Sequence, residues 1–109
     1  MEFKNLCPHD IEIRINRNET IVIPQSDTIA RIQWETQYWK TVGSIPIHFR
    51  SIKNVVGMPK EKSGVLYVVS NIVQEQLSDE RTDLVSPDRM SAFITHGKVK
   101  NVEKLVRWK

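Results

Sequence analysis

Histidines and carboxylates are the residues that could carry acid–base chemistry in this chain of 109 residues. His9 and Asp10 are adjacent, whereas Asp83 and Asp88 lie far along the chain. A histidine within hydrogen-bond reach of a substrate proton is a common general acid or base, and carboxylates do the same work. One hypothesis is therefore a small hydrolase or transferase that uses His9 with Asp10, Asp83 or Asp88.

Other kinds of site are disfavoured by residue type and spacing. Neighbouring side chains of a strand point to opposite faces, so His9 and Asp10 are poorly placed to share a metal ion, and His48 and His96 are isolated. The glycines, at 43, 57, 64 and 97, form no phosphate-binding fingerprint. Cys7 is the one cysteine and is expected to be a small buried side chain rather than a nucleophile. We expect no metal and no cofactor.

A polar cluster late in the chain is a candidate anion site. Arg81, Asp83 and Asp88 follow a predicted strand and helix, and Ser70 lies where that helix begins. Loops held by a rigid scaffold often carry binding residues, and backbone N–H groups at a helix start favour anions. The alternative is an Arg–Asp pair that only pins the loop. Arg31, on the polar face of a predicted strand, has the same two interpretations.

Alternating apolar and polar residues predict strands in the first half of the chain. Isoleucines at 11, 13 and 15 alternate with polar residues, which predicts a strand over 10–16 with one buried face. A β-branched run over 20–23 ends at Pro24, so the two segments predict a hairpin. Alternation predicts a third strand over 28–35.

The second half predicts one central strand and one helix. The run 65–69 is apolar on both faces, as in a strand covered on two sides. A short helix is predicted over about 70–78, with Ser70 or Asn71 as its cap. Residues 45–50 predict an edge strand, because Pro46 cannot donate to a ladder. Residues 79–88 are interpreted as an acidic loop, and 98–108 as strands, with a helix as the alternative.

These elements, about six to eight short strands and one helix, predict an α+β fold with a small mixed or antiparallel sheet. The chain length suits a single globular domain over 1–109. The longest apolar run, 65–69, is far shorter than the roughly 20 residues that cross a bilayer, and no signal peptide is recognised. We therefore expect a cytoplasmic protein without a membrane partner.

The formal charge of +3 is unevenly distributed. Residues 89–109 contain six basic side chains and one acidic one, while 79–88 are net acidic. A basic tail suits an anionic partner such as a nucleic acid, but lysines on edge strands also discourage aggregation. If the two segments neutralise each other in the fold, the signal for an anionic partner disappears.

Four stretches of the chain resemble a group of small uncharacterised proteins from bacteriophages, prophages and bacterial genomes. Residues 5–11 resemble that group's opening N-L-x-P-H-D-I, and residues 24–31 are similar to its P-P-S-G-x-x-A-R stretch. Residues 66–70 are similar to L-Y-I-V-S, and 81–87 to R-x-D-L-x-x-P. Gln25 and Asp27 depart from the pattern, which affects the turn after Pro24. The resemblance implies a phage or prophage origin, hence the host cytoplasm, and no established activity.

The matching stretches focus the candidate site on polar residues that we expect to converge at one end of the sheet and bind a ligand: His9, Asp10, Ser26, Arg31, Ser70, Arg81, Asp83 and Asp88. The leading hypothesis is a non-enzymatic phage or prophage accessory protein that binds a host protein or a small anionic ligand such as a nucleotide. The alternatives are the His9 hydrolase or transferase and nucleic-acid binding through the basic tail. An assembly role through an exposed edge strand such as 45–50 is also open.

Overall fold

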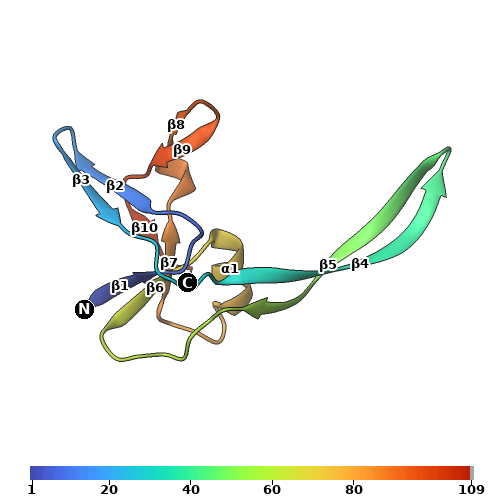
Figure 1. The fold of residues 1–109 in the computed structure, drawn as a ribbon, viewed down its shortest axis with the longest axis horizontal. Helices are drawn as coiled ribbons and strands as arrows, with labels where there is room; N and C mark the ends of the chain where they lie inside the picture. Colours follow the sequence, from blue (N-terminus) through green and yellow to red (C-terminus); the bar gives the residue numbers. More distant parts are fainter. Residues whose placement is uncertain (109) are drawn as a thin grey trace.

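The computed structural model describes residues 1–108 and is built mostly from short strands with one short helix (Figure 1). The predicted combination of strands and helix is thus confirmed in outline, although strands dominate. In chain order the described elements are β1 (Glu2–Asn5), β2 (Ile11–Asn16), β3 (Glu19–Ile23), β4 (Arg31–Val42), β5 (Ile45–Val56), β6 (Val65–Val68), α1 (Asn71–Leu77), β7 (Leu84–Pro87), the 3-10 helix η1 (Arg89–Ser91), β8 (Phe93–Thr95), β9 (Lys98–Asn101) and β10 (Leu105–Val106).

The largest sheet has four strands in the order β1-β6-β7-β10. Strand β6 runs parallel to both neighbours, and β10 pairs antiparallel with β7. The predicted central strand is confirmed, since Val68 and Val69 are completely buried. A parallel strand covered on both faces is expected to be apolar throughout, as this one is.

Two core clusters lie on opposite faces of β6. Val65, Tyr67 and Val69 pack in one cluster with Val73 of α1, whereas Val68 packs in the other. That second cluster includes Ile11, Ile13 and Ile23 of the β2–β3 hairpin. The predicted buried face of β2 is confirmed for Ile11 and Ile13, whereas Ile15 at its far end is exposed.

The helix agrees closely with its prediction. Ser70 is the N-cap, and its hydroxyl accepts a hydrogen bond from the backbone N–H of Val73. Gln74 is buried, and both polar atoms of its side chain form hydrogen bonds. The amide nitrogen donates to the Ser86 hydroxyl at 2.7 Å and to the Val106 carbonyl at 3.3 Å, and the amide oxygen accepts from the Trp108 N–H at 2.6 Å. This one side chain ties the C-terminal strand β10 to the helix.

Some elements differ from the sequence prediction. Residues 84–87 are not loop but the strand β7, with Leu84, Val85 and Ser86 buried. The acidic residues on either side concealed a strand of only four residues. The N-terminal strand β1 was also not predicted, because its apolar content is low. In the tail, β9 and β10 confirm strands over the helical alternative.

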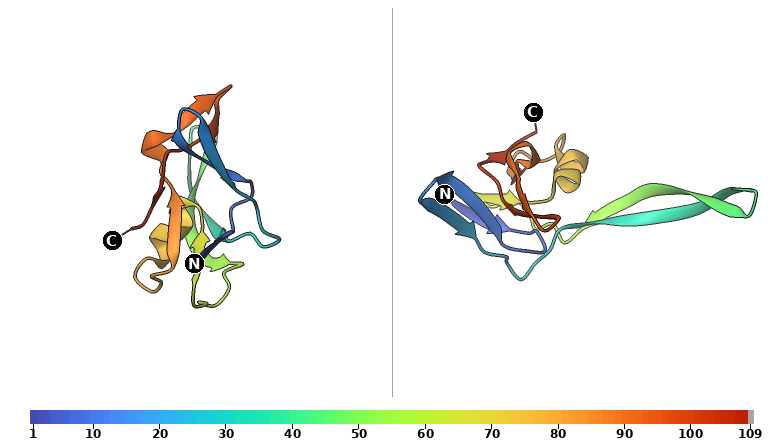
Figure 2. Two further views of the ribbon diagram at one scale, coloured as in Figure 1. Left: turned by 90° about the vertical axis from the view of Figure 1, so that its left-hand side faces the viewer. Right: turned by 90° about the horizontal axis from the view of Figure 1, so that it is seen from above.

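The third and fourth predicted strands are longer than expected and form a separate two-stranded ribbon. Strand β4 pairs antiparallel with β5 over nearly their whole length, with bulges near Lys53 and Trp39. The ribbon projects away from the rest of the fold, as Figure 1 and the right-hand view of Figure 2 show. The Cα radius of gyration is 16.7 Å, whereas a compact chain of this length is expected at about 13 Å. We call residues 31–56 the ribbon and the remaining described residues the body.

Within the described part of the chain, no helix is both long and apolar enough to cross a membrane.

Candidate functional site

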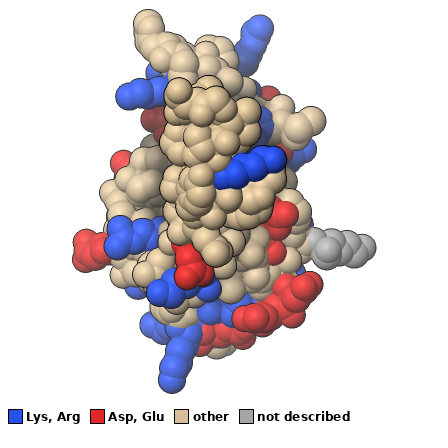
Figure 3. All heavy atoms as spheres, turned by 90° about the vertical axis from the view of Figure 1, so that its right-hand side faces the viewer, with Lys and Arg blue, Asp and Glu red and all other residues tan. Residues whose placement is uncertain are grey.

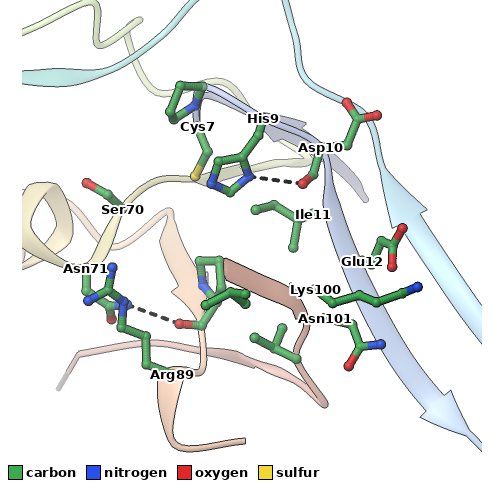
Figure 4. Close-up of a pocket in the computed structure, with 14 residues that line it drawn as sticks. Cys7, His9, Asp10, Ile11, Glu12, Ser70, Asn71, Arg89, Lys100 and Asn101 are labelled. Atoms are coloured by element: carbon green, nitrogen blue, oxygen red, sulfur yellow. Dashed lines mark hydrogen bonds between the residues drawn. The ribbon is translucent and has the colours of Figure 1, made fainter. Parts of the chain in front are cut away.

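A pocket of about 300 Å³ opens on the body where several separate segments meet (Figure 4). Its walls come from the loop before β2, the start of α1, the end of β7 and strand β9. The lining is partly apolar and partly polar, and comprises Cys7, Pro8, His9, Asp10, Ile11, Glu12, Ser70, Asn71, Pro87, Arg89, Val99, Lys100, Asn101 and Val102.

The loop that forms one wall is held by a buried asparagine. The Asn5 side-chain amide donates to the carbonyls of His9 and Ile23, both at 3.0 Å, and its oxygen accepts from the Cys7 N–H at 2.8 Å. Asn5 is 1% exposed, so these bonds satisfy an amide that would otherwise be costly to bury. The loop is therefore a rigid wall rather than a free flap.

The opposite wall is fixed at the carboxyl end of β7. The Asn71 amide donates to the Pro87 carbonyl at 3.1 Å (Figure 4). Asp88 is buried, and its carboxylate accepts from the Met90 N–H, which caps the 3-10 helix that begins at Arg89. These contacts set the backbone from which the Arg89 side chain extends.

Two cations border the pocket without an ion pair. Arg89 and Lys100 are both exposed, and within residues 1–108 neither forms a salt bridge. Apolar side chains, Ile11, Val99 and Val102, lie between the polar groups of the lining. A pocket with apolar walls and a few placed polar groups is the usual form of a small-molecule site. The lining also contains two carboxylates, Asp10 and Glu12, so its charged side chains are two acidic and two basic.

The titratable groups on the Cys7 side of the pocket are less suited to chemistry. Burial raises the pKa of the Cys7 thiol to about 11, so it stays protonated at neutral pH. A thiol in that state is a poor nucleophile, which agrees with the prediction of a small buried side chain. The His9 ring nitrogen Nδ1 lies 3.0 Å from the Asp10 carbonyl oxygen. The Asp10 carboxylate instead accepts from the Gln25 N–H at 2.8 Å.

The structure brings together some of the residues predicted for the site. His9, Asp10 and Ser70 all line the pocket. Asp88 lies between two lining residues, Pro87 and Arg89, but is not itself part of the lining. Its carboxylate serves the backbone cap described above.

Arg81 and Asp83 do not join this group. They form a bidentate ion pair, with Nε to Oδ1 at 2.9 Å and Nη2 to Oδ2 at 2.8 Å, and Arg81 also donates to the Pro59 carbonyl. Hydrogen bonding to Arg81 lowers the pKa of Asp83, and the same bond raises the pKa of Arg81. The Arg81 guanidinium lies 5.8 Å from the Tyr67 ring centroid. These contacts support the alternative in which the pair pins the loop to the core.

Ser26 and Arg31 lie apart from the pocket as well. The Ser26 hydroxyl bonds within its own turn, to the backbone of Thr28. Arg31 is exposed at the first position of β4, at the base of the ribbon. The predicted convergence of all the polar residues at one end of the sheet therefore holds only for part of the set.

The acidic segment and the basic tail do not neutralise each other through direct pairs. Among the described residues, Asp83 pairs with Arg81 in its own segment, and Glu103 of the tail pairs with Arg14 of β2 at 2.8 Å. Tail cations such as Arg89 and Lys100 are thus left for other partners. No cluster of three or more metal-ligating side chains is present in residues 1–108.

Sequence reasoning missed most of the polar lining, including Glu12. Asn71 was considered only as a helix cap, and Arg89 and Lys100 only as charges of the tail. Asn101 was seen only as a turn. The signal that could have found them is topological, because β9 lies near β2 through the bridge between Ile13 and Val102.

Comparison of the chain with protein-family profiles, with curated proteins and with solved structures finds no match.

Proposed function

We propose that this protein is a non-enzymatic binding protein whose pocket takes a small anionic ligand such as a nucleotide. The observation that carries the proposal is a pocket whose lining combines apolar side chains with two cations, Arg89 and Lys100, that form no salt bridge with the lining carboxylates Asp10 and Glu12 or with any other described residue. An anion there gains charge-assisted hydrogen bonds without first breaking an internal ion pair. A planar base is accommodated by the aliphatic side chains of the lining.

The size of the pocket supports a small ligand. Its volume of about 300 Å³ is at the lower end of the range for small-molecule sites, which is roughly 300–1,000 Å³. A mononucleotide or a similar phosphorylated metabolite is of the right order, whereas a long polymer would be held only at its end. The side-chain amide nitrogen of Asn101 adds a donor, whereas the Asn71 amide already donates to the Pro87 carbonyl.

We place the protein among phage or prophage accessory factors, on the resemblance of its four sequence stretches. Three of those stretches contribute to the lining, through His9, Ser70 and Pro87 among others. A host protein remains the second partner class, because the mouth of the pocket is exposed. In that case a carboxylate on a loop of the host protein binds where the anionic group of a small ligand would otherwise bind.

An enzyme is supported less well by the same contacts. The carboxylates expected to work with His9 each have another role: Asp10 binds the Gln25 backbone, Asp83 binds Arg81 and Asp88 caps η1. No hydrogen bond in the described part of the chain joins His9 to a carboxylate. The raised pKa of the Cys7 thiol also disfavours covalent chemistry.

Titration calorimetry and thermal shift with a panel of nucleotides, sugar phosphates and inorganic phosphate test the proposal. We expect at least one phosphorylated compound to bind, and Arg89→Gln and Lys100→Gln each to weaken its binding about tenfold or more, as for the loss of a charged hydrogen bond. Arg107→Gln is the matched control, because Arg107 is an exposed tail cation outside the lining.

A panel in which nothing binds would contradict the small-ligand proposal. Equal loss of affinity in Arg89→Gln and Arg107→Gln would show attraction by overall charge rather than by the pocket. Retention of a host protein by the wild type, lost in Lys100→Gln and kept in Arg107→Gln, would favour the second partner class.

A further inference from the structure

The ribbon leaves large apolar and aromatic side chains exposed on both faces. Trp34 is 39% exposed, and Tyr38 and Phe49 are each 55% exposed. Ile45 at the tip is 68% exposed. Viewed end-on along the ribbon, most of the surface facing the reader carries neither acidic nor basic side chains (Figure 3). A two-stranded ribbon of this kind is marginally stable alone in water, and three or more strands with an apolar face are usually needed.

Each ribbon strand also has an open edge. The sheet contains only β4 and β5, so one side of each strand has unpaired N–H and C=O groups in the described structure. Proteins usually blunt such edges with proline, charge or bulges. Strand β5 has Pro46 together with the like charges of Arg50 and Lys53, and it has no carboxylate. Both strands have charged side chains and a bulge, but β4 has no proline, so β4 is the less protected edge.

The charges of β4 are self-complementary. Between Ile32 and Val42 the strand has one acid, Glu35, and one base, Lys40. Both charges lie on the same face of the strand as Gln37. Glu35 is on this face because it is two residues from Gln37. Lys40 is on it because its ammonium lies 4.3 Å from the ring centroid of Trp39, and Trp39 packs on Phe49, the residue paired with Gln37. The bulge at Trp39 is what puts Lys40 on this face.

We propose that β4 pairs antiparallel with β4 of a second copy of this chain, about a twofold axis at Gln37. In that register Gln37 faces its own equivalent, and Glu35 faces the bulged residues Trp39 and Lys40 of the second copy. Each charge is thereby matched once, and the twofold axis generates two equivalent Glu35–Lys40 contacts, as in an isologous interface. The equivalent pairing of β5 would place only cations together, which is destabilising.

The pairing converts two ribbons into one four-stranded sheet in the order β5-β4-β4-β5. Trp34 then lies opposite Thr41 of the second copy, and Thr36 lies opposite its Tyr38, so the aromatic side chains gain neighbours. The Arg50 guanidinium, 4.5 Å from the Trp34 ring centroid, remains on the outer strand. The open edge of β4 is paired in each chain, while β5, the strand with Pro46, remains at the outer edge of the sheet.

Sedimentation and native mass measurements over a dilution series test the proposal with charge-reversal variants. We expect the wild type to dimerise. Glu35→Lys and Lys40→Glu each create two like-charge contacts across the axis, so we expect each to raise the dimer dissociation constant about tenfold. The double variant Glu35→Lys with Lys40→Glu restores opposite charges and is expected to return within about threefold of the wild type.

Cysteine cross-linking provides a measurement that does not depend on affinity. Gln37→Cys places two thiols directly opposite each other across the axis, within the usual distance for a cross-strand disulfide. We expect a covalent dimer on mild oxidation. The matched control is Ser51→Cys, exposed on the same face but on the other strand of the ribbon, which is expected to stay uncoupled.

A wild type that stays monomeric at every concentration would overturn the proposal, as would a double variant no better than the single ones. Equal cross-linking through Ser51→Cys would overturn the β4 register. A monomer that gains mass only when a single-stranded oligonucleotide is added would assign the ribbon to nucleic acid instead. Circular dichroism of each variant confirms that the fold is kept.

Discussion

The body and the ribbon of this protein use similar residues in opposite ways. In the body, Leu6, Val68 and Val69 are completely buried in the two core clusters that lie on either face of β6. In the ribbon, Trp34, Phe49 and Ile45 lie on a two-stranded sheet and stay partly exposed, although Arg50 covers part of Trp34 and Trp39 packs on Phe49. Hydrophobicity alone does not decide whether a side chain is buried, because burial also needs a second layer of structure to cover it. The body therefore contains a buried core, whereas the ribbon lacks a second layer.

The largest expected effect separates the two regions directly. Leu6→Ala removes a fully buried side chain from the body core, and we expect it to lower the free energy of unfolding by about 4 kcal/mol. Phe49→Ala in the ribbon is expected to cost about 0.5 kcal/mol or less in the monomer. Urea denaturation at low protein concentration measures both. Similar losses in the two variants would mean that the ribbon has a core of its own.

The junction between body and ribbon is the next target. Gly57 follows β5 with φ +85°, and a Cβ placed there would collide with the Ile29 carbonyl oxygen. We expect Gly57→Ala to cost about 3 kcal/mol, from the left-handed backbone and the clash together. Gly64→Ala is the matched control, since its φ is +80° but the space beside it is open, and about 1 kcal/mol is expected. Equal losses in thermal unfolding would argue against the close approach.

Buried polar side chains of the body are expected to contribute less to the free energy of unfolding than its buried apolar side chains. Gln74→Ala removes hydrogen bonds to Ser86, Val106 and Trp108 and leaves the buried Ser86 hydroxyl without its partner. We expect a loss of about 2 kcal/mol. Hydrogen exchange should show faster opening of β10, while the ribbon amides are unchanged. Uniform acceleration throughout the chain would indicate that the side chain does more than hold β10.

The smallest expected effect is the acid sensitivity of the body. The pKa of Asp83 is lowered by its bond to Arg81, so the folded state holds the charged form more strongly than the unfolded chain does. Its contribution is present above the unfolded pKa of about 4 and is lost as pH falls through the folded pKa. We expect Asp83→Asn to cost about 1 kcal/mol at pH 7 and less at pH 3. Denaturation midpoints that differ equally at both pH values would contradict this sign.

Sequence patterns could find the elements whose side chains alternate or whose caps are explicit. The isoleucines of β2 and the Ser70 cap of α1 are of this kind. The strand β7 was hidden, because four residues between acidic neighbours carry too little pattern. The sequence predicted only parts of the two ribbon strands. Their full length depends on strand pairing that continues through bulges, which local composition does not encode. Arg89 and Lys100 line the same pocket as His9 and Ser70 only because strand pairing brings their segments together. The sequence alone could therefore predict His9 and Ser70 as site residues but not the two cations.

The parallel pairing of β1 with β6 has a consequence for how the chain is made. Glu2 aligns with Val65, so this pairing joins residues separated by more than half of the chain, whereas Asn5 at the end of β1 also bridges to Gln25. The ribbon, by contrast, pairs residues that are close in sequence, and local hairpins form within microseconds. The β2–β3 hairpin of the body is equally local, so the hairpin and the ribbon can both form before β1 meets β6. The four-stranded sheet, whose strands are far apart in the sequence, is therefore expected to form last.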